Sequence, residues 1–456
     1  MQAFHCLSIV LLYFAAQAAA ANYDYRQVLG YSMLFYEAQR SGHLPADQHV
    51  TWRHDSALND KGQNGEDLTG GYYDAGDFVK FGFPMAYTIT VLSWGAIEYA
   101  QGYDSAGLTN DIQEAIRWGT DYFLKCHTQD LTLYGQVGNG EADHAWWGRP
   151  EEMPMDRPAY AITQDNAGSE LAGETAAALA AASIVFQNVD SGYANTLLQH
   201  AQTLFNFAND HRKTYVQSIT DAVSFYNSYN GFNDEIVWAA LWIAKATNDQ
   251  SWTQRAQSLY DEFQMSTIDL LNFSWDDKSA AIEALFTELT NDDNHKNKLQ
   301  SYAEDVLHSR PRTPMGLVFI DAWGSLRHAG NAAFITLRAA ELGVGNRDDY
   351  INFARQQLGY MLGDTGRSYV VGFGQNYPTH PHHRASSCPD APATCNWDQF
   401  NTNDPNPQLL YGALVGGPDQ NDQYTDIRTD PQHNEVACDY NAAFSGALAS
   451  FIQNNY

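Results

Sequence analysis

The chain has 456 residues, of which 13% are aromatic, and its formal net charge at pH 7 is −29. This charge argues against a nucleic-acid partner, because the phosphates would be repelled, whereas a neutral polymer carries no such penalty. The length fits two or three domains or one large barrel. Because the sequence has no Pro/Ser/Thr-rich linker, low-complexity tract or terminal charge block, we expect one structural unit.

Residues 1–20 form the first predicted element. They contain an apolar core, residues 7–16, which small residues follow and which no Lys or Arg precedes. Apart from that missing basic residue, the pattern is typical of a secretory signal peptide. The core is too short to span a bilayer, and no later stretch approaches the ~20 apolar residues that a spanning helix needs. We therefore expect residues 21–456 to form a single secreted, extracellular domain with no membrane partner.

Helical periodicity dominates the rest of the chain, and Gly, Pro, Asn and Asp mark the ends of the predicted helices. These helices run over residues 24–40, 84–102, 109–127, 169–188, 192–210, 232–247, 250–264, 279–290, 297–310, 321–343, 348–361 and 440–453. Twelve helices suggest an all-α fold in which six helical hairpins form a double-layered barrel, with long loops building an open cleft at one end. A multi-domain helical protein is also compatible with this pattern.

Four long segments without helical periodicity separate the predicted helices. Residues 41–83, 128–168, 211–231 and 364–435 hold most of the Gly, Pro and His residues and nearly every cluster of acids with aromatics. Loops of this length in a compact domain are usually functional. Strand signals are few and short, for example over residues 369–373.

Two carboxylates three residues apart, Asp74 and Asp77, lie in the glycine- and aromatic-rich segment 70–78, and a third, Glu435, lies far downstream. The glycines predict a sharply turning loop. An Asp-x-x-Asp pattern alone is also typical of a solvated turn or a helix cap. Hydrolysis of a glycosidic bond needs one carboxylic acid to protonate the leaving oxygen and one carboxylate to activate water or attack the sugar. These three residues supply both groups.

Two further motifs carry a family resemblance. The first is Gly-Gln-Asn at 374–376 followed by Pro-His-His-Arg at 381–384, and the second runs from Tyr424 through Glu435 to Asn441. With these motifs after an Asp-Ala-Gly-Asp segment, the chain resembles the glycoside hydrolase family 9 cellulases over nearly its whole length. The likeness is greatest to the single-domain animal enzymes of the termite and other invertebrate type. The chain departs from the family pattern at Pro431, where an aromatic residue is usual.

The resemblance implies a fold, a reaction and three roles. The fold would be an (α/α)6 barrel, and the reaction would be hydrolysis of internal β-1,4-glucosidic bonds of cellulose and related β-glucans, with inversion and without a cofactor. Asp77 would be the general base, Asp74 its partner on the nucleophilic water, and Glu435 the general acid. The protein would be a monomeric endo-β-1,4-glucanase secreted into a digestive fluid. A catalytically silent β-glucan-binding protein would require a broken acid or base, and all three carboxylates are present.

The resemblance also implies residues that bind β-1,4-glucan chains. These are His144, Tyr226, Trp323, Arg327, His382, Arg384 and Tyr440. Aromatic faces stack well on flat, equatorially substituted glucose rings. The three imidazoles within residues 380–383 could also suggest zinc, but Pro381 separates them and no further Cys or His spacing completes a site.

A calcium site is the last prediction from the resemblance. Its ligands would be Asn230, Gly231, Asp234, Glu235 and Asp276. Hard oxygen ligands on a loop before a helix suit Ca²⁺. In the alternative interpretation, the two adjacent acids only favour the positive end of the following helix.

Four cysteines follow the predicted signal peptide. Cys388 and Cys395 lie seven residues apart in a Pro-rich loop, and secretion favours a local disulfide between them. Cys126 and Cys438 lie in apolar helical surroundings and are predicted to be buried thiols. The spacing of the four gives no metal signature.

Overall fold

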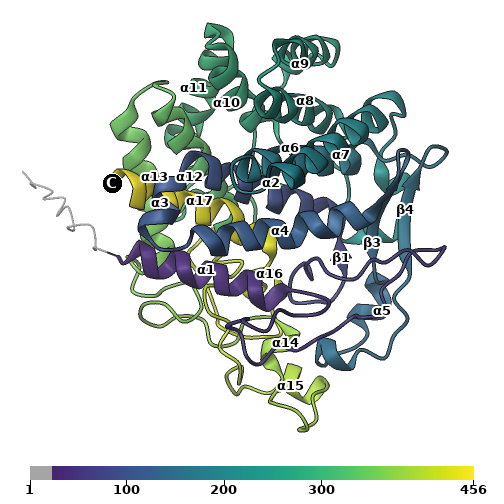
Figure 1. The fold of residues 1–456 in the computed structure, drawn as a ribbon. Helices are drawn as coiled ribbons and strands as arrows, with labels where there is room; N and C mark the ends of the chain where they lie inside the picture. Colours follow the sequence, from purple (N-terminus) through teal and green to yellow (C-terminus); the bar gives the residue numbers. More distant parts are fainter. Residues whose placement is uncertain (1–22) are drawn as a thin grey trace, which may run out of the picture.

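The computed structural model describes residues 23–456, so the predicted signal peptide lies outside the described residues. Twelve helices of 12 to 20 residues dominate this part of the chain and alternate between an outer and an inner layer (Figure 1). The outer helices are α1 (Tyr25–Gln39), α4 (Thr109–Cys126), α7 (Ser191–Asp210), α9 (Gln250–Glu262), α11 (Asp293–His308) and α13 (Arg347–Leu362). The inner helices are α2 (Gly82–Glu98), α6 (Ser169–Phe186), α8 (Asn233–Thr247), α10 (Ser279–Thr290), α12 (Ser325–Glu341) and α17 (Cys438–Asn454).

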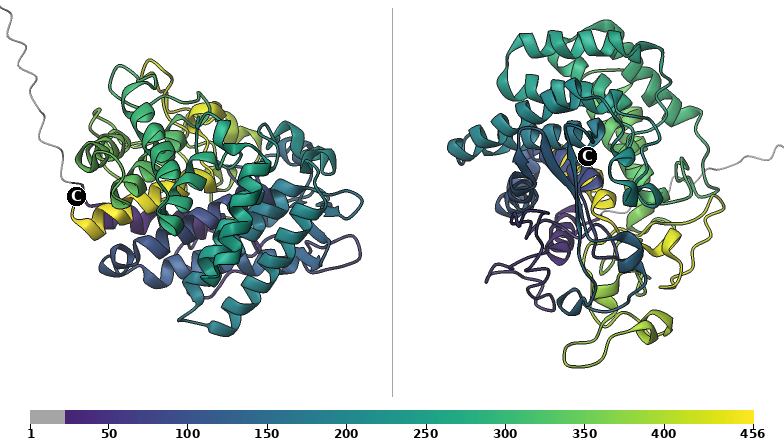
Figure 2. Two further views of the ribbon diagram at one scale, coloured as in Figure 1. Left: turned by 90° about the horizontal axis from the view of Figure 1, so that it is seen from above. Right: turned by 90° about the vertical axis from the view of Figure 1, so that its right-hand side faces the viewer.

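The inner helices form a closed ring. Contacts run from α2 to α6, α8, α10, α12, α17 and back to α2, while each outer helix packs on an inner one, as α7 does on α6 and α13 on α12. Two further views show the long helices grouped side by side with the loops gathered outside them (Figure 2). The predicted (α/α)6 barrel is confirmed.

Side-chain size explains how six helices fit inside one ring. Nearly every residue of α6 is buried, and alanines fill much of it, whereas the outer helices bury only one face. At the crossing of α2 and α17, a Cβ on Gly95 would lie 3.2 Å from the Cα of Gly446, so glycine permits this close approach. Trp94 packs edge-on against Trp238 and Phe334, with ring centroids 5.6 and 5.1 Å away, and fills the centre of the ring.

Helix α6 is the only helix among residues 23–456 that is long and apolar enough to cross a membrane, which the sequence analysis did not anticipate. Of that 18-residue window, 89% is buried inside the protein. A helix that is apolar all round and enclosed by other helices is a core helix of the barrel.

A small antiparallel sheet that was not predicted lies outside the barrel. Its strands are β1 (Lys80–Phe81), β2 (His127–Gln129), β3 (Thr132–Val137) and β4 (Ala159–Thr163), and β3 pairs with each of the others. Lys80 pairs with Val137, and Leu133 with Ile162. Because β1 directly follows the segment that holds Asp74 and Asp77, the sheet anchors the end of that segment. The strand expected over 369–373 is only an isolated bridge from Val370 to Leu414.

Short helices punctuate the loops. They are α3 (Ala100–Ser105), α5 (Gly140–His144), α14 (Arg384–Ser387), α15 (Trp397–Asn401) and α16 (Pro431–Asn434), with 3-10 turns at Pro150–Glu152, Tyr215–Gln217, Thr220–Ser224 and Met265–Thr267. Helices α5, α14 and α15 lie on the side of the molecule opposite α9 to α11, and the loop that carries α15 projects at its edge (Figure 1). The loops that carry α5, α14 and α15 therefore lie on one side of the barrel.

Candidate active site

The segment that carries Asp74 and Asp77 turns at two glycines with positive φ. Gly70 has φ +94° and Gly71 has φ +72°, which an L side chain rarely adopts, as the sequence predicts. The Asp74 amide donates to the carbonyl of Val79 at 3.1 Å, and the Asp74 carbonyl accepts from the amide of Cys438 at 2.9 Å. The second bond ties the segment to the first residue of α17, 364 residues downstream along the chain.

A glycine is needed at position 76 because another backbone segment passes close to it, and not because of its φ angle. A Cβ at this position would overlap the carbonyl oxygen of His382. The amide of Arg384 donates to the Gly76 carbonyl at 3.1 Å. Residues 74–77 therefore pack directly against residues 382–384, so two of the sequence motifs meet in space.

Asp77 is 5% exposed, and its own loop holds its carboxylate. Oδ1 accepts from the Ala75 amide and Oδ2 from the Val79 amide, each at 3.3 Å. Burial raises the pKa of Asp77, and the negative charge of Asp143 raises it further, while His144, Arg384 and the Val79 amide oppose this. The carboxyl is therefore more basic than an ordinary aspartate, as a general base requires.

Asp74, also 5% exposed, is held from the other side of the site. The hydroxyl of Tyr226 donates to its Oδ2, while Oδ1 is buried without a hydrogen-bond partner. Burial and the charge of Asp77 raise the pKa of Asp74 well above its usual value. A buried acceptor without a partner is costly unless water or a ligand meets it, so Oδ1 is suited to hold a water molecule.

Glu435 follows α16, whose first residue is Pro431. Proline suits the first position of a helix because its fixed φ is helical and no amide is needed there, so the departure from the family pattern is accommodated. A parallel bridge joins Glu435 to His382, whose amide donates to the carbonyl of Asn434 at 2.8 Å. Burial raises the pKa of Glu435 to about 8, and the charge of Asp77 contributes. The three predicted carboxylates therefore meet in one place.

Three more predicted residues line this place from α12, α17 and the 380s segment. Arg327 pairs with Asp439 at 3.1 Å and lies over the ring of Tyr440, with 5.1 Å from its carbon Cζ to the ring centroid. Tyr440 in turn packs against Ala75. The Nδ1 atom of His382 lies 2.7 Å from the carbonyl of Arg428, which leaves Nε2 for other partners.

Three predicted residues are placed differently from the others. Trp323 is 45% exposed and lies just before α12. Arg384 is only 3% exposed, and its guanidinium binds both the carbonyl and the carboxylate of Asp143. His144, which follows Asp143, is exposed and packs against Phe225.

The three histidines at 380–383 form no metal cluster within the described part of the chain. The side chain of His380 faces Asp426, that of His382 faces the carbonyl of Arg428, and that of His383 faces Gln39. The three rings therefore contact three different partners.

Sequence reasoning missed two buried acids, Asp143 and Asp439. Each is 1% exposed and pairs with an arginine of the predicted site, Asp143 with Arg384 and Asp439 with Arg327. The available signal was their position directly before His144 and Tyr440, which were predicted. Burial of two arginines beside these acids became visible only in the fold.

The chain matches the family model described as glycosyl hydrolase family 9 over residues 25–448. The chain belongs to glycosyl hydrolase family 9. The structure of an endoglucanase from the termite Nasutitermes takasagoensis is 59% identical, with a TM-score of 0.94, and covers 96% of this chain and 100% of the termite chain. Endoglucanase A of Bacillus pumilus is 45% identical over 95% of this chain and 67% of its own length. Endoglucanase 19 of Arabidopsis thaliana is 41% identical over 98% of this chain and 77% of its own length.

These comparisons confirm the predicted family, its termite-like character and the class of glycoside hydrolase. The cellulase Cel9M of C. cellulolyticum in complex with cellobiose is 32% identical, with a TM-score of 0.88, and covers 95% of this chain and 100% of its own. The roles of single residues in this family 9 domain are not tested by these similarities and stay predictions.

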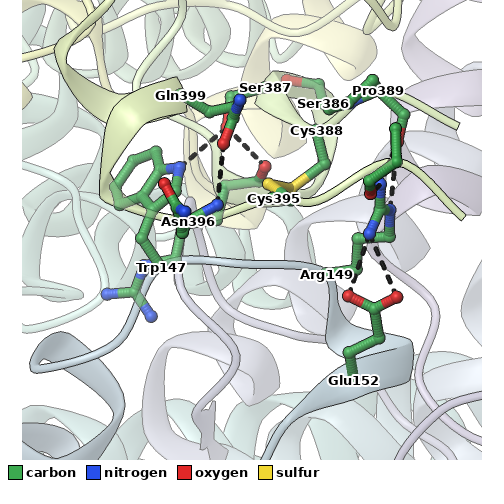
Figure 3. The surroundings of a disulfide bond; sticks show 12 residues. Trp147, Arg149, Glu152, Ser386, Ser387, Cys388, Pro389, Cys395, Asn396 and Gln399 are labelled. Carbon is green, nitrogen blue, oxygen red and sulfur yellow. Dashed lines mark hydrogen bonds and ion pairs between the residues drawn. A yellow bond between two sulfur atoms is a disulfide. The ribbon is translucent and has the colours of Figure 1, made fainter. Parts of the chain in front are cut away.

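The family 9 domain contains the predicted disulfide between Cys388 and Cys395, and both remaining cysteines are buried as expected. The disulfide closes a loop beside α14, where Trp147 donates to the hydroxyl of Ser387 at 2.9 Å (Figure 3). Arg149 donates to the carbonyl of Pro389 at 3.0 Å. The loop is thereby fixed to the segment that follows His144.

Of the predicted calcium ligands, Asp234 and Glu235 lie in the first turn of α8 and face residues 276–278, while Asn230 and Gly231 lie in the loop before α8, where the Asn230 side chain donates to the Asp276 carbonyl at 3.4 Å. The amide of Lys278 donates to Asp234 at 2.8 Å, its ammonium pairs with Glu235 at 2.9 Å, and the amide of Tyr229 donates to Asp276 at 3.1 Å. Oε2 of Glu235 is buried without a partner. Burial raises the pKa of Asp276 to about 7, and repulsion by Asp234 adds to it.

An oxygen-binding cation fits this cluster. Asp234, Glu235, Asp276 and Asp277 lie near one buried cation of the protein, Lys278, which Glu174 also shares. A divalent ion would offset the excess of buried negative charge. Within the described residues, however, the acid and histidine atoms that converge within 4.8 Å are those of Asp77, Asp143 and His144, not those of the predicted calcium site. Calcium therefore stays a prediction.

Proposed function

We propose that this chain is an endo-β-1,4-glucanase that cleaves internal β-1,4-glucosidic bonds of cellulose and related β-glucans with inversion of configuration. The observation that carries the mechanism is the meeting of Asp74, Asp77 and Glu435 from segments far apart in the sequence, with the pKa of Glu435 raised to about 8. The names of the relatives support the substrate, as do structures of C. cellulolyticum Cel9M with cellobiose and Clostridium thermocellum CelQ with cellobiose and cellotriose.

The two aspartates have different roles toward the attacking water. Burial and mutual repulsion favour a single negative charge on the pair. Two backbone amides and the nearby Arg384 favour that charge on Asp77. Asp77 therefore removes the water proton, while the free Oδ1 of Asp74 holds the same water in place.

Glu435 acts on the leaving group. Near neutral pH its raised pKa keeps it protonated, so it can donate a proton to the glycosidic oxygen as the bond to the anomeric carbon breaks. The water oxygen forms the new bond to that carbon from the opposite face, and its proton goes to Asp77. One proton enters the leaving sugar from Glu435 and one is taken up by Asp77, so the acid and the base must exchange protons with solvent before the next turnover.

The predicted binding residues complete the proposal. The exposed ring of Trp323 is free to stack on a glucose ring, while Tyr440, Arg327 and His382 lie beside the carboxylates. Arg384 is bound to Asp143, so we propose that it contributes its charge to the site more than a direct sugar contact. Tyr226 fixes Asp74, and His144 borders Asp143.

A silent β-glucan-binding protein on the same fold is not favoured. Binding neutral sugar needs no cluster of buried carboxylates with raised pKa values, and such a cluster is costly to the fold. Two aspartates and one glutamate are retained here, and each is buried or half-buried where a two-carboxylate hydrolase needs it.

The anomeric configuration of the first products tests the mechanism. Proton NMR of oligosaccharides released from a β-linked glucan should show the α-anomer first, and Asp77→Asn should lower turnover by about 10² to 10⁴-fold. If the β-anomer forms first, an Asp is acting as a covalent nucleophile and Asp77 is not the base on water.

Secretion, a monomeric state and structural calcium belong to the same proposal. The disulfide supports secretion, because such bonds persist in oxidising compartments. Expression of the full chain in a secreting host, with N-terminal sequencing of the protein in the medium, tests cleavage after residues 1–20. Light scattering of the purified protein tests the monomer.

A further inference from the structure

Asp143 is an almost fully buried carboxylate that the proposed mechanism does not use. It lies on α5 and is 1% exposed. Its Oδ1 accepts from the amide of Phe78 at 3.2 Å, and its Oδ2 and carbonyl both accept from the guanidinium of Arg384. A buried carboxylate with this many donors is held in one position.

The position that Asp143 holds is next to the proposed base. Asp77, Asp143 and His144 each offer an atom within 4.8 Å of the others. Phe78, whose amide Asp143 binds, is the residue directly after Asp77, so Asp143 also fixes the backbone that carries the base. In this group the Asp143 carboxylate is bound by Arg384, and the Nδ1 atom of His144 lies 2.8 Å from the Gly140 carbonyl.

Arg384 explains why an acid is needed here. Its guanidinium is buried, lies over the rings of Phe78 and Trp147, and acts on the charge of Asp77. A buried arginine without a partner beside a carboxylate would form an ion pair with it. An Asp77 paired in that way would be a weaker base, and one of its oxygens would be occupied.

We propose that Asp143 is a positioning residue: it binds the Phe78 amide and occupies the Arg384 guanidinium, so that the Asp77 carboxylate stays free to take a proton from water. The inference rests on the proposed role of Asp77 as the base. The charged groups that face Asp77 are Asp74 on its own loop, Asp143 and His144 on α5, Arg384 on α14, and Glu435 after α16.

The test is the pH dependence of kcat/KM for Asp143→Asn on a soluble β-1,4-glucan. Asparagine keeps the size of the side chain and removes its charge, so Arg384 should turn its charge to Asp77. We expect kcat to fall about 10 to 100-fold, because misplacing a catalytic group costs on this order. We also expect the acid limb, which reports the ionisation of the base, to move down by about one pH unit or more.

The control is Glu283→Gln on α10. Glu283 is also 1% exposed and bonded to buried partners, Tyr260 at 2.7 Å and His295 at 2.6 Å, neither of them among the active-site residues. Removing the charge of Glu283 should lower the melting temperature and leave the acid limb of the kcat/KM profile at the same pH. Asp143→Ser, which keeps an acceptor for the Phe78 amide without the charge, tests the same shift if the asparagine variant does not fold.

An acid limb that stays in place in both Asp143 variants would overturn the inference, whatever the loss in kcat, because a merely structural ion pair would behave in that way. Failure of the proposed function is seen separately. If the wild-type enzyme releases product of inverted configuration and Asp77→Asn is inactive, the assignment of Asp77 as the base stands and only the role of Asp143 is refuted. If wild-type product retains configuration, the base assignment itself fails.

Discussion

At the scale of single residues, the surroundings of similar carboxyl groups favour different protonation states. Asp74 and Asp77 have the same exposure, but one is bound by a tyrosine hydroxyl and the other by two backbone amides beside an arginine. For Glu435, burial outweighs the opposing effects of Arg384 and the Gly76 backbone and keeps the carboxyl protonated at neutral pH. Pairs of acids whose surroundings favour different protonation states are the usual sign of an acid and a base.

Glu435→Gln tests the acid at this scale. Glutamine has nearly the same shape but no proton to give, so turnover of cellulose should fall by about 10² to 10⁴-fold while β-glucan binding and the melting temperature stay near wild type. Because the pKa of Glu435 is raised to about 8, wild-type kcat/KM should decline above about pH 8, where the acid loses its proton. Turnover of substrates with good leaving groups, which need no proton from the enzyme, should fall much less in this variant. Near-normal cellulose turnover in the variant would remove Glu435 from this role.

The sequence predicted residues whose type and spacing carry the chemistry, but not those that act through a neighbour. Asp74, Asp77 and Glu435 were found because their segments match a family pattern. Asp143 was not found, because its importance comes from contacts with Phe78 and Arg384 that only the fold creates. The sequence predicted that Gly76 is needed for a sharp turn, whereas the structure shows that it is needed because the backbone closely approaches His382.

At the scale of elements, helices were predictable and the sheet was not. The long helices bury periodic apolar faces or are apolar throughout, and both patterns are visible in sequence. Errors occurred at their ends: the helix expected over 84–102 divides into α2 and α3, and α12 starts at Ser325, because Gly324 before it has φ +69°. The strands have two to six residues and pair across loops, so their order depends on contacts that no local pattern records.

Gly76→Ala tests how two loop elements are held together. A methyl group would meet the carbonyl oxygen of His382 and push residues 74–77 away from residues 382–384. We expect kcat to fall about 100-fold and the free energy of unfolding to fall by about 1 to 3 kcal/mol. Gly30→Ala on α1 is the control, since its added carbon would find Leu108 at 3.9 Å, an ordinary contact. Equal activity in the two variants would mean that the close approach does not set the catalytic geometry.

At the scale of the whole molecule, the barrel brings the residues predicted to act or to bind ligands to one end of the inner ring. Because inner and outer helices alternate along the chain, the six inner helices run in the same direction, and their N-termini meet at one end. These predicted residues lie at or just before the N-termini: Asp77 before α2, Glu235 on α8, Asp276 before α10, Arg327 on α12, and Glu435 and Tyr440 around the start of α17. Helix N-termini carry partial positive charge, which offsets part of the cost of gathering so many carboxylates.

The calcium proposal is tested on the stability of the whole barrel. Asp276 and Asp277 have pKa values raised to about 7 and about 6, with burial as the first cause, so the metal-free native state binds more protons than the unfolded chain between about pH 4 and 7. Stability of the metal-free protein should therefore fall as pH rises through that range and level off above it. Calcium binds the ionised carboxylates and should restore the stability that the metal-free protein loses as pH rises. At a calcium concentration of about 1,000 times Kd the gain would be about 4 kcal/mol.

Removal of calcium by a chelator should thus lower the melting temperature by several degrees at pH 8 and by much less at pH 5, as scanning calorimetry would measure. In Asp276→Asn the chelator should have little effect at either pH. Asp293→Asn provides the matched control, because its exposed side chain lies on α11, away from the cluster, and the response to chelation should match wild type. If Asp234 and Glu235 serve only to favour the positive end of α8, wild-type melting curves with and without chelator will coincide at both pH values, and elemental analysis will find no calcium. That result would leave Lys278 as the cation that pairs with Glu235 and Glu174 and would return the cluster to a purely structural role.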